Sequence, residues 1–311
     1  MELLLLGPGW GSLEQRLSAA GFVLHRAHKL PGLDAILAQS AGVIRGIITY
    51  SGCTQVDDAL LARLPALGII ANLGVGYESV DADAARARGV AVTNGAGANA
   101  PDVAELTIGL MLAVTRKMVE ADRYVRSGKW LDRRMALTTR MTGKRLGLLG
   151  IGSIGRAVGQ LGAAFSMDVA YCARKQRADL AWRFEPDLAA LAESVDYLIA
   201  AVPDSRETRG MVSARVLEAL GAEGILISVG RGPVVDEAAL VAALQSGALG
   251  GAGLDVFDRE PEVPEALLTS DRVVLSPHMG GATRDSIEAG AVLAVANLEA
   301  FAAGKKLLTP V

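Results

Sequence analysis

The feature that most constrains this chain is a run of glycines placed directly after an apolar segment. Leu146-Gly147-Leu148-Leu149 has the composition of a buried strand, and Gly150-Ile151-Gly152-Ser153-Ile154-Gly155 follows it. Beyond Gly155 the apolar residues take helical spacing, so the glycines occupy a strand–turn–helix junction. This is the context in which a G-x-G-x-x-G pattern binds a dinucleotide. The predicted cofactor-binding residues of the turn are Gly150, Gly152, Ser153, Ile154 and Gly155.

Each glycine of the turn has a separate physical role in that prediction. Gly150 allows the tight turn, Gly152 lets the backbone approach a pyrophosphate, and Gly155 lets the helix pack closely on the strand. The helix that starts here supplies unpaired N–H groups and the positive end of its dipole to the phosphates.

Alternation of short apolar runs with helical segments extends over nearly the whole chain and predicts an α/β protein. The expected strands of a first block are 1–6, 46–50, 68–71 and 90–93, with helical spacing in 59–64 and 81–88. A second block has expected strands at 145–150, 168–172, 196–202, 224–229, 252–256 and 272–276. Two successive blocks of this kind predict two doubly wound domains, each with a parallel sheet covered on both faces.

Between the two blocks, a long helix is expected over about 101–126. Asn99 or Asp102 is expected to start it, and Asp102 has capping-box spacing with Glu105. The segment 119–145 is polar and basic, but it lacks the regular interleaving of aromatic residues with the charges that nucleic-acid binding would favour. We therefore expect an arm that packs on a partner subunit. A last helix is expected over 284–303.

Composition narrows the classes of function. The chain has 311 residues, enough for two domains, and its net charge of −3 argues against a nucleic-acid partner. No apolar stretch has the length of about 20 residues that a membrane helix needs. Cys53 and Cys172 form neither a disulfide framework nor a metal-ligand spacing, which predicts a cytoplasmic protein without a metal site.

The end of the second strand of the later block indicates which dinucleotide is preferred. An acidic residue about 20 positions after the glycines would select NAD(H) by binding the ribose 2′-hydroxyl. Here Ala173-Arg174-Lys175 follows the strand, and no carboxylate appears before Asp179. Arg174 and Lys175 are suited to a 2′-phosphate, so NADP(H) is favoured; a solvated loop that accepts NAD(H) as well is the alternative.

Three further strand ends carry candidate catalytic side chains. Arg231 follows the strand 224–229 between two glycines, Glu260 follows the strand 252–256, and His278 follows the strand 272–276. Because the carboxyl ends of parallel strands line one crevice, these side chains are expected to converge. Individually they have ordinary explanations: an ion-pair partner, a turn acid and a hydrogen-bonded loop histidine.

Together the three residues match the reduction of a 2-oxo acid. A cation is needed for the carboxylate and the polarised carbonyl, which Arg231 supplies with two parallel hydrogen bonds. His278 is suited to deliver the proton, and Glu260 to orient the imidazole and stabilise its protonated form. The hydride comes from the cofactor.

The chain resembles the D-isomer-specific 2-hydroxyacid dehydrogenases almost from end to end. The resemblance rests on ordered motifs: Asn72-Leu73-Gly74-Val75-Gly76-Tyr77, Val103-Ala104-Glu105, the glycine turn, Val202-Pro203-Asp204-Ser205-Arg206-Glu207-Thr208, and the Arg231, Glu260 and His278 motifs. Ala173-Arg174 departs from NAD-dependent members and is similar to the NADP-using glyoxylate/hydroxypyruvate reductases.

The resemblance implies a flavodoxin-like substrate domain, 1–98 plus 286–311, around a Rossmann cofactor domain, 99–285. It implies an active site in the cleft between them, in a homodimer held mainly by the cofactor domains. By the same resemblance the substrate carboxylate is bound by the backbone of Leu73, Gly74, Val75 and Gly76. The further dinucleotide contacts it implies are Val202, Pro203, Thr208 and, at the nicotinamide amide, Asp255.

Two other functions remain open on the sequence. Fold alone does not exclude a dinucleotide-sensing protein similar to transcriptional corepressors. A second enzyme reading is 3-phosphoglycerate dehydrogenase, short forms of which also lack a regulatory domain. The expected function is a reductase of a small D-2-hydroxy/2-oxo acid such as glyoxylate or hydroxypyruvate.

Overall fold

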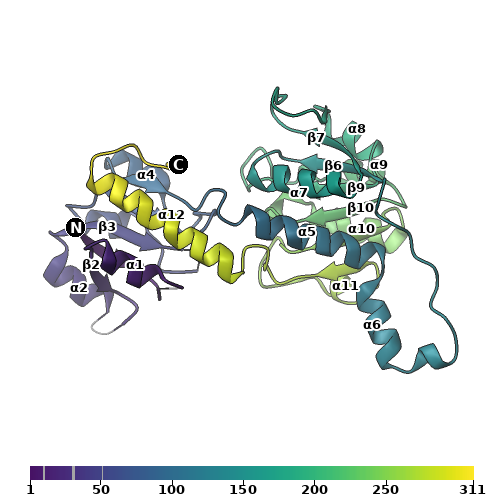
Figure 1. Cartoon of the computed structure of the whole chain (residues 1–311), viewed down its shortest axis with the longest axis horizontal. Coiled ribbons are helices and arrows are strands. Elements are labelled where there is room, and N and C mark those ends of the chain that lie inside the picture. Colours follow the sequence, from purple (N-terminus) through teal and green to yellow (C-terminus); the bar gives the residue numbers. More distant parts are fainter. Residues whose placement is uncertain (10, 30–31, 51) are drawn as a thin grey trace. The chain divides into compact units, whose positions relative to one another are not determined.

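The computed structural model describes residues 1–9, 11–29, 32–50 and 52–311. The chain forms two compact units, Met1–Asn99 with Ala282–Val311, and Ala100–Gly281 (Figure 1). Each unit is built on one parallel sheet. Among the described residues no helix combines the length and the apolar character that crossing a bilayer requires.

The first unit contains a five-stranded sheet in the order β2-β1-β3-β4-β5, with all neighbours parallel. Its strands are β1 (Glu2–Leu5), β2 (Val23–Arg26), β3 (Ile44–Thr49), β4 (Ile69–Asn72) and β5 (Ala91–Thr93). Its helices are α1 (Leu13–Ala19), α2 (Leu33–Ser40), α3 (Asp58–Ala62), α4 (Ala82–Ala87) and α12 (Arg284–Ala302).

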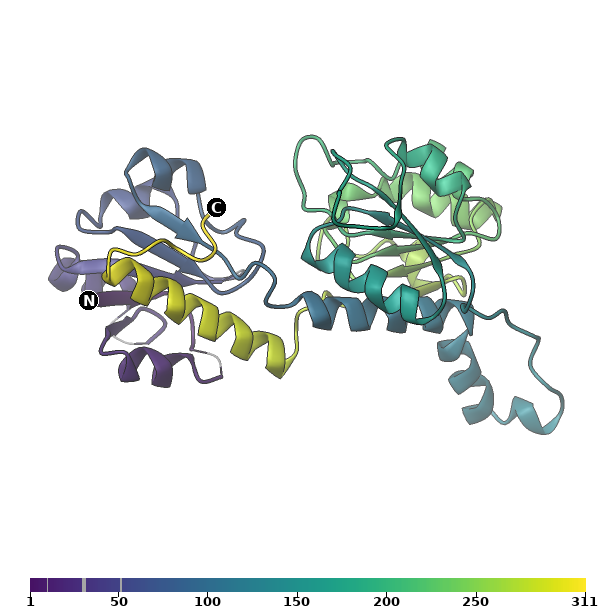
Figure 2. The same cartoon turned by 45° about the horizontal axis from the view of Figure 1, so that its top comes forward.

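Alternate residues of these strands enter two separate cores. Leu3 and Leu5 pack with apolar side chains of α1 and α12, whereas Leu4 packs with those of α2 and α3 on the other face. This alternation is the period-two pattern of a strand that is buried on both sides. The long helix α12 therefore returns the chain end to the first unit (Figure 2).

The second unit contains a seven-stranded parallel sheet in the order β12-β11-β10-β9-β6-β7-β8. Its strands are β6 (Arg145–Leu149), β7 (Asp168–Cys172), β8 (Arg183–Phe184), β9 (Tyr197–Ala200), β10 (Ile225–Ser228), β11 (Gly251–Leu254) and β12 (Val273–Leu275). Its helices are α5 (Ala100–Thr115), α6 (Met118–Arg126), α7 (Ser153–Ala164), α8 (Leu188–Glu193), α9 (Ala214–Leu220), α10 (Glu237–Ser246) and α11 (Glu265–Leu268), with the 3-10 turns η1 (Lys129–Leu131) and η2 (Gly232–Val234).

Helices cover both faces of this sheet as well. α5 and α7 pack on one face, against Leu146, Leu148 and Ile199 among others. α8, α9 and α10 pack on the opposite face. The prediction of two doubly wound α/β units with parallel sheets is therefore confirmed.

Ten strands predicted from the sequence are present, most of them shorter at one or both ends. β2 and β8 are absent from that prediction. β2 contains His25 and Arg26 and is only partly buried, and β8 has two residues, so neither shows a continuous apolar run.

The helix predicted over 101–126 is wrong as a single element. Lys117 has a φ of 50°, in the left-handed region, and it separates α5 from α6. α5 begins at Ala100, which agrees with the predicted start at Asn99. The alternative start at Asp102, with its capping box, is wrong because Asp102 lies inside the first turn. Beyond the break, α6 and η1 form an arm (residues 118–141) with no buried residue in either element (Figure 1).

Candidate active site

The glycine turn between β6 and α7 has the geometry that a closely approaching ligand requires. Gly150 has a φ of +96°, and a Cβ at Gly155 would lie 2.1 Å from the Gly150 carbonyl oxygen. A Cβ at Gly152 would meet nothing within 4 Å, so space is open in front of the first turn of α7. Gly152 is also the N-cap residue and has no side chain to occupy the N–H groups there. The turn is therefore a cradle for an anion at a helix N-terminus.

The loop after β7 carries the predicted cofactor-selecting residues, and it is fixed at two points. The backbone N–H of Arg177 donates to the hydroxyl of Tyr171, which is fully buried in β7, over 2.7 Å. At the far end of the loop, Arg156 of α7 forms an ion pair with Asp179 over 2.6 Å. That hydrogen bond lowers the pKa of Asp179 and keeps its carboxylate engaged. Arg174 itself is exposed.

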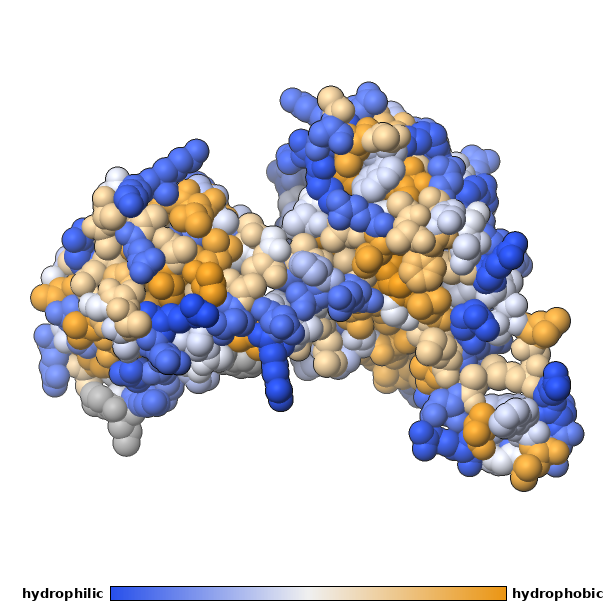
Figure 3. Space-filling model, viewed as in Figure 1, coloured by the Kyte–Doolittle hydropathy of each residue, from blue (hydrophilic) through white to orange (hydrophobic). Residues whose placement is uncertain are grey.

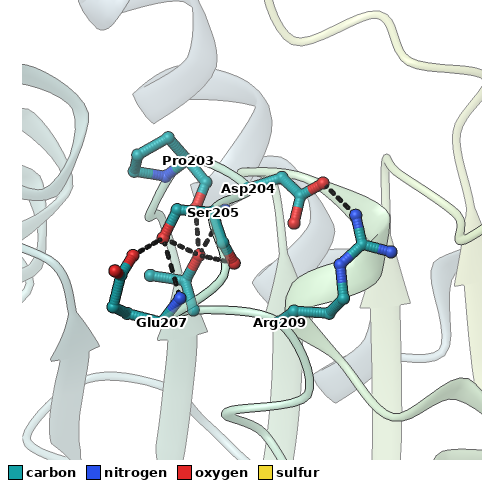
Figure 4. A network of polar contacts seen from close by, with 6 residues as sticks. Pro203, Asp204, Ser205, Glu207 and Arg209 are labelled. Atoms are coloured by element: carbon teal, nitrogen blue, oxygen red, sulfur yellow. Dashed lines mark hydrogen bonds and ion pairs between the residues drawn. The ribbon is translucent and has the colours of Figure 1, made fainter.

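Residues after β9 form a compact turn held by hydroxyl groups (Figure 4). Thr208 Oγ1 donates to the carbonyl oxygen of Pro203 over 2.7 Å and accepts from the N–H of Ser205 over 2.8 Å. Ser205 Oγ donates to Glu207 over 2.7 Å. This bond lowers the pKa of Glu207, with a smaller contribution from the positive charge of Arg174. The turn and the cofactor-selecting loop are thus electrostatic neighbours.

Arg231 follows β10 in a tightly packed turn. A Cβ at Gly232 would lie 1.8 Å from the carbonyl oxygen of Phe257, so only glycine permits this approach of the two segments. Arg231 Nη1 donates to the carbonyl oxygen of Gly230 over 2.8 Å. Since β10 and β11 are adjacent, Arg231 and the segment that leads to Glu260 lie at the carboxyl ends of neighbouring strands.

Glu260 and His278 are brought together. Glu260 Oε2 lies 2.7 Å from Nδ1 of His278, and Glu260 Oε1 accepts the N–H of Phe257 over 3.0 Å. Their side chains are 34% and 46% exposed, so the pair is open to a ligand from solvent. The carboxylate is fixed at one oxygen and orients the imidazole with the other.

Asp255 organises the loop that carries His278. Its buried carboxylate accepts the N–H groups of Met279 and Gly280 over 2.7 and 2.8 Å, and the hydroxyl of Ser276. His278 has a φ of 53°, a strained conformation for a residue with a side chain. The hydrogen bonds to Asp255 on both sides of His278 hold the loop in that conformation.

The predicted carboxylate-binding loop lies in the first unit, at the end of β4. Asn72 Nδ2 donates to the carbonyl oxygens of Gly74 and Gly76 over 2.7 and 2.9 Å. Asn94 Nδ2 donates to the carbonyl oxygen of Val75 over 2.8 Å. The Gly74 carbonyl is turned to Asn72, so the N–H of the same peptide, that of Val75, points the opposite way. Neither this N–H nor that of Gly74 has an acceptor within the described part of the chain. The loop therefore presents donors, as an anion requires.

Sequence reasoning missed three residues that shape these sites: Asn72, Asn94 and Tyr171. Asn72 and Asn94 each follow or end a strand of the first unit, and buried amides at strand ends are the only signal that distinguishes them. Tyr171 is hidden among the apolar residues of its strand. Its hydroxyl gains a role only through the loop that folds back over it.

Comparison with known proteins places the second unit in one family. Residues 108–280 match the model for the D-isomer specific 2-hydroxyacid dehydrogenase, NAD binding domain. The chain is 41% identical to glyoxylate/hydroxypyruvate reductase A of Arabidopsis thaliana over 309 residues, which cover 99% of this chain and 98% of that protein. The chain belongs to the D-isomer-specific 2-hydroxyacid dehydrogenase family.

Further members agree along the full length. Hydroxyphenylpyruvate reductase of Plectranthus scutellarioides is 42% identical over 309 residues, with 99% of this chain and 98% of that protein covered. The structure of an NADPH-dependent glyoxylate/hydroxypyruvate reductase from Sinorhizobium meliloti, in complex with NADP and malonate, has a TM-score of 0.88 and 39% identity, covering 100% of this chain and 96% of that one.

As a D-2-hydroxyacid dehydrogenase, the protein is an oxidoreductase that transfers a hydride between a nicotinamide dinucleotide and a 2-hydroxy or 2-oxo acid. This confirms the enzyme predicted from the sequence and its cofactor class. The glycine turn fits such a dinucleotide, because Gly152 leaves open space at the N-terminus of α7. The similar proteins named here are reductases, which gives no support to the alternative of a binding protein on the same fold.

Proposed function

We propose that this dehydrogenase reduces small 2-oxo acids such as glyoxylate and hydroxypyruvate, with NADPH as the favoured donor. The observation that carries the proposal is the 2.7 Å contact between Glu260, which follows β11, and His278, which follows the neighbouring strand β12. On its other side β11 neighbours β10, which leads to Arg231. An acid, its orienting carboxylate and a guanidinium at one edge of a sheet are the groups that this reduction needs.

The proposed catalytic roles follow from which atoms of His278 and Glu260 are already hydrogen-bonded to each other. Nδ1 of His278 faces Glu260, which leaves Nε2 as the nitrogen that gives a proton to the carbonyl oxygen. Arg231 polarises that carbonyl and binds the adjacent carboxylate. A dinucleotide held by the glycine turn would supply the hydride that the carbonyl carbon accepts. Carbon and oxygen each gain one hydrogen, and the product is the 2-hydroxy acid.

The loop Leu73–Gly76 is proposed to bind the substrate carboxylate through its N–H groups. The N–H of Val75 supports this role, because Asn72 binds the Gly74 carbonyl of the same peptide and thereby turns that N–H the opposite way. Residues 1–98 with 286–311, which contain this loop, are therefore proposed as the substrate domain. Residues 99–285, which contain the glycine turn, are proposed as the dinucleotide domain.

The dinucleotide is proposed to lie on the glycine turn and along the ends of β9 and β11. The residues of this proposal are Gly150, Gly152, Ser153, Ile154, Gly155, Val202, Pro203, Thr208 and Asp255. Thr208 has its hydroxyl engaged within its own turn, so its contribution is to shape that turn. Asp255 Oδ2 accepts one N–H and has a second lone pair, with which the nicotinamide amide is proposed to bond.

NADP(H) preference is proposed to rest on Arg174 and Lys175. Both are exposed, and Ala173 stands where an acid would repel a 2′-phosphate. Asp179, the first carboxylate after β7, is paired with Arg156, which supports a net positive field at this end of the site.

The arm (residues 118–141) supports a homodimer. Most of its large apolar side chains before Met141 are exposed (Figure 3), and Leu131 and Leu137 reach 93% and 99%. A groove of about 860 Å3 at the base of the arm, lined in part by Val119 and Leu275, offers a complementary surface. We assign the arm and the groove to the contact with a second copy. A contact in which both copies use the same surface forms a closed dimer with two-fold symmetry. Light scattering should give a dimer, and Leu137→Asp should weaken it.

A cytoplasmic location is proposed with the dimer. Cys53 and Cys172 are both free thiols, which suits a reducing compartment.

A substrate panel tests the proposed function. Glyoxylate, hydroxypyruvate, pyruvate and phosphohydroxypyruvate are each supplied with NADPH and with NADH, and kcat/KM is measured. We expect the highest values for glyoxylate or hydroxypyruvate with NADPH. A preference for phosphohydroxypyruvate would instead favour 3-phosphoglycerate dehydrogenase. A preference for aromatic 2-oxo acids would favour the activity named for hydroxyphenylpyruvate reductase, a relative with 42% identity.

A further inference from the structure

The C-terminal segment Leu307–Val311 is attached to the edge of the sheet in the first unit. Val311 N donates to the carbonyl oxygen of Val92 over 3.0 Å, and Asn94 N donates to that of Thr309 over 3.2 Å. Thr93 and Pro310 form an antiparallel bridge. The segment thus covers the free side of the edge strand β5 and reaches the strand end where Asn94 lies.

Asn297 of α12 binds this C-terminal segment through hydrogen bonds of its side-chain amide. It is completely buried, and its amide is used fully: Oδ1 accepts the N–H groups of Leu308 and Thr309 over 2.9 and 3.3 Å. Nδ2 donates to the carbonyl oxygen of Leu293 and, over 3.0 Å, to Thr309 Oγ1. A buried amide with all of these bonds satisfied specifies one position of the segment.

Thr309 transmits that position to Asn94. Its hydroxyl accepts from Asn297 and donates to the carbonyl oxygen of Asn94 over 2.6 Å. The backbone of Asn94 is therefore bonded to Thr309 through both its N–H and its carbonyl.

Asn94 in turn contacts the loop Leu73–Gly76. Its Nδ2 donates to the carbonyl oxygen of Val75 over 2.8 Å, and the next N–H, of Gly95, donates to that of Gly74 over 2.7 Å. A Cβ at Gly95 would lie 2.3 Å from the carbonyl oxygen of Leu73, so the two segments are in backbone contact. In a trans peptide the N–H points opposite to the carbonyl of the preceding residue, so the bonds to the Gly74 and Val75 carbonyls decide where the N–H groups of Val75 and Gly76 point.

We infer that Thr309 and Asn297 are positioning residues for substrate binding. They act through Asn94 and aim the N–H groups of the loop Leu73–Gly76 at the substrate carboxylate. The inference rests on the proposed role of that loop. It assigns to the C-terminal segment, which contains none of the proposed catalytic residues, a part in the affinity for the 2-oxo acid.

Thr309→Val tests the inference, because valine keeps the shape and removes both hydroxyl bonds. We expect KM for the 2-oxo acid, and the inhibition constant of oxalate as an anionic probe, to rise about 3- to 10-fold, the loss of one or two hydrogen bonds. kcat and the NADPH dissociation constant should stay within about 2-fold, since no contact to the second unit's residues is altered. Thr309→Ser, which keeps the hydroxyl, should restore both constants.

Two further variants separate positioning from stability. Leu308→Ala removes a half-exposed side chain from the same segment and keeps its backbone bonds, so its KM should match that of the wild type. Asn94→Ala removes the bond to Val75 and should raise KM at least as much as Thr309→Val. A lower Tm of Thr309→Val with unchanged KM and oxalate inhibition would overturn the inference.

The proposed function fails in a different way. If the wild-type enzyme neither turns over 2-oxo acids nor binds oxalate, the proposed function is wrong and the inference falls with it. If the wild type is active and Asn94→Ala raises KM while Thr309→Val does not, only the role of the C-terminal segment is wrong.

Discussion

Glu260 holds Nδ1 of His278 at 2.7 Å while its other oxygen accepts the N–H of Phe257. The carboxylate is thus anchored to the backbone of its own turn before it meets the imidazole. Such a pair keeps one ring nitrogen occupied and leaves the other with a defined direction.

His278→Gln should lower kcat about 10²- to 10⁴-fold, the usual contribution of a general acid. The NADPH dissociation constant should not change, because glutamine alters only the proton donor. Steady-state kinetics and cofactor fluorescence measure the two quantities. His25→Gln is a matched control: His25 pairs with Glu2 over the same 2.7 Å in the first unit, and its variant should keep normal turnover. Near-normal kcat in His278→Gln would refute the catalytic role.

Arg231→Lys should raise KM for the 2-oxo acid by at least about 10-fold, and Arg231→Ala should abolish useful turnover. Lysine keeps the charge but lacks the planar fork that binds a carboxylate through two parallel hydrogen bonds. Kinetics with glyoxylate compare the two variants. Arg215→Ala, an arginine on the surface of α9 that is 78% exposed, should behave as wild type. Equal KM values for Arg231→Lys and wild type would place carboxylate recognition elsewhere.

Arg174→Ser should lower the ratio of kcat/KM for NADPH to that for NADH by about 10-fold or more. The variant loses charge-assisted hydrogen bonds to the 2′-phosphate, which NADH does not have. Arg86→Ser removes an arginine from an exposed pair in the first unit and serves as the control. If the ratio is the same in both variants, the 2′-phosphate does not contact Arg174.

Gly152→Ala and Gly155→Ala should separate cofactor binding from folding. At Gly152 the added methyl group meets open space, so we expect a normal Tm with NADPH affinity reduced about 10-fold or more, because that space is where the pyrophosphate approaches. At Gly155 it would lie 2.1 Å from the Gly150 carbonyl oxygen, and the cost of overpacking is about 1–3 kcal/mol. Thermal unfolding and NADPH titration measure both. A stable Gly152→Ala variant with unchanged affinity would contradict the predicted site.

Asp196→Asn should lower the free energy of unfolding at neutral pH by on the order of 1 kcal/mol. Hydrogen bonds from Arg145 lower the pKa of Asp196 below its ordinary value, so the native state favours the ionised carboxylate. A group with a depressed native pKa contributes stability above its unfolded-state pKa of about 3.9, and this is lost as the pH falls through the native value. Urea unfolding should therefore show a difference at pH 7 that shrinks below about pH 4. Asp83→Asn is the control, because the Asp83 side chain is 92% exposed in its ion pair with Arg86.

Much of the site was predictable because its signals are local. Arg231, Glu260 and His278 each follow an apolar strand, and parallel strands bring their carboxyl ends to one edge, so the sequence predicts their convergence. The contact between Glu260 and His278 agrees with that reasoning. The break at Lys117 was not predictable in the same way, since apolar spacing continues across it and only the left-handed conformation of one residue ends the helix.

Sequence alone therefore determined the class of fold, the glycine turn and the types of residue that the chemistry needs, because strand composition, glycine conformation and motif order are properties of short segments. Tertiary structure alone decided which polar groups hold those residues in place. Tyr171 braces the loop of Arg174, Asp255 braces the loop of His278, and Thr309 meets Asn94 across 215 residues of chain. Hydrogen bonds between segments so far apart depend on how strands and chain ends are laid side by side, and no local pattern records that arrangement.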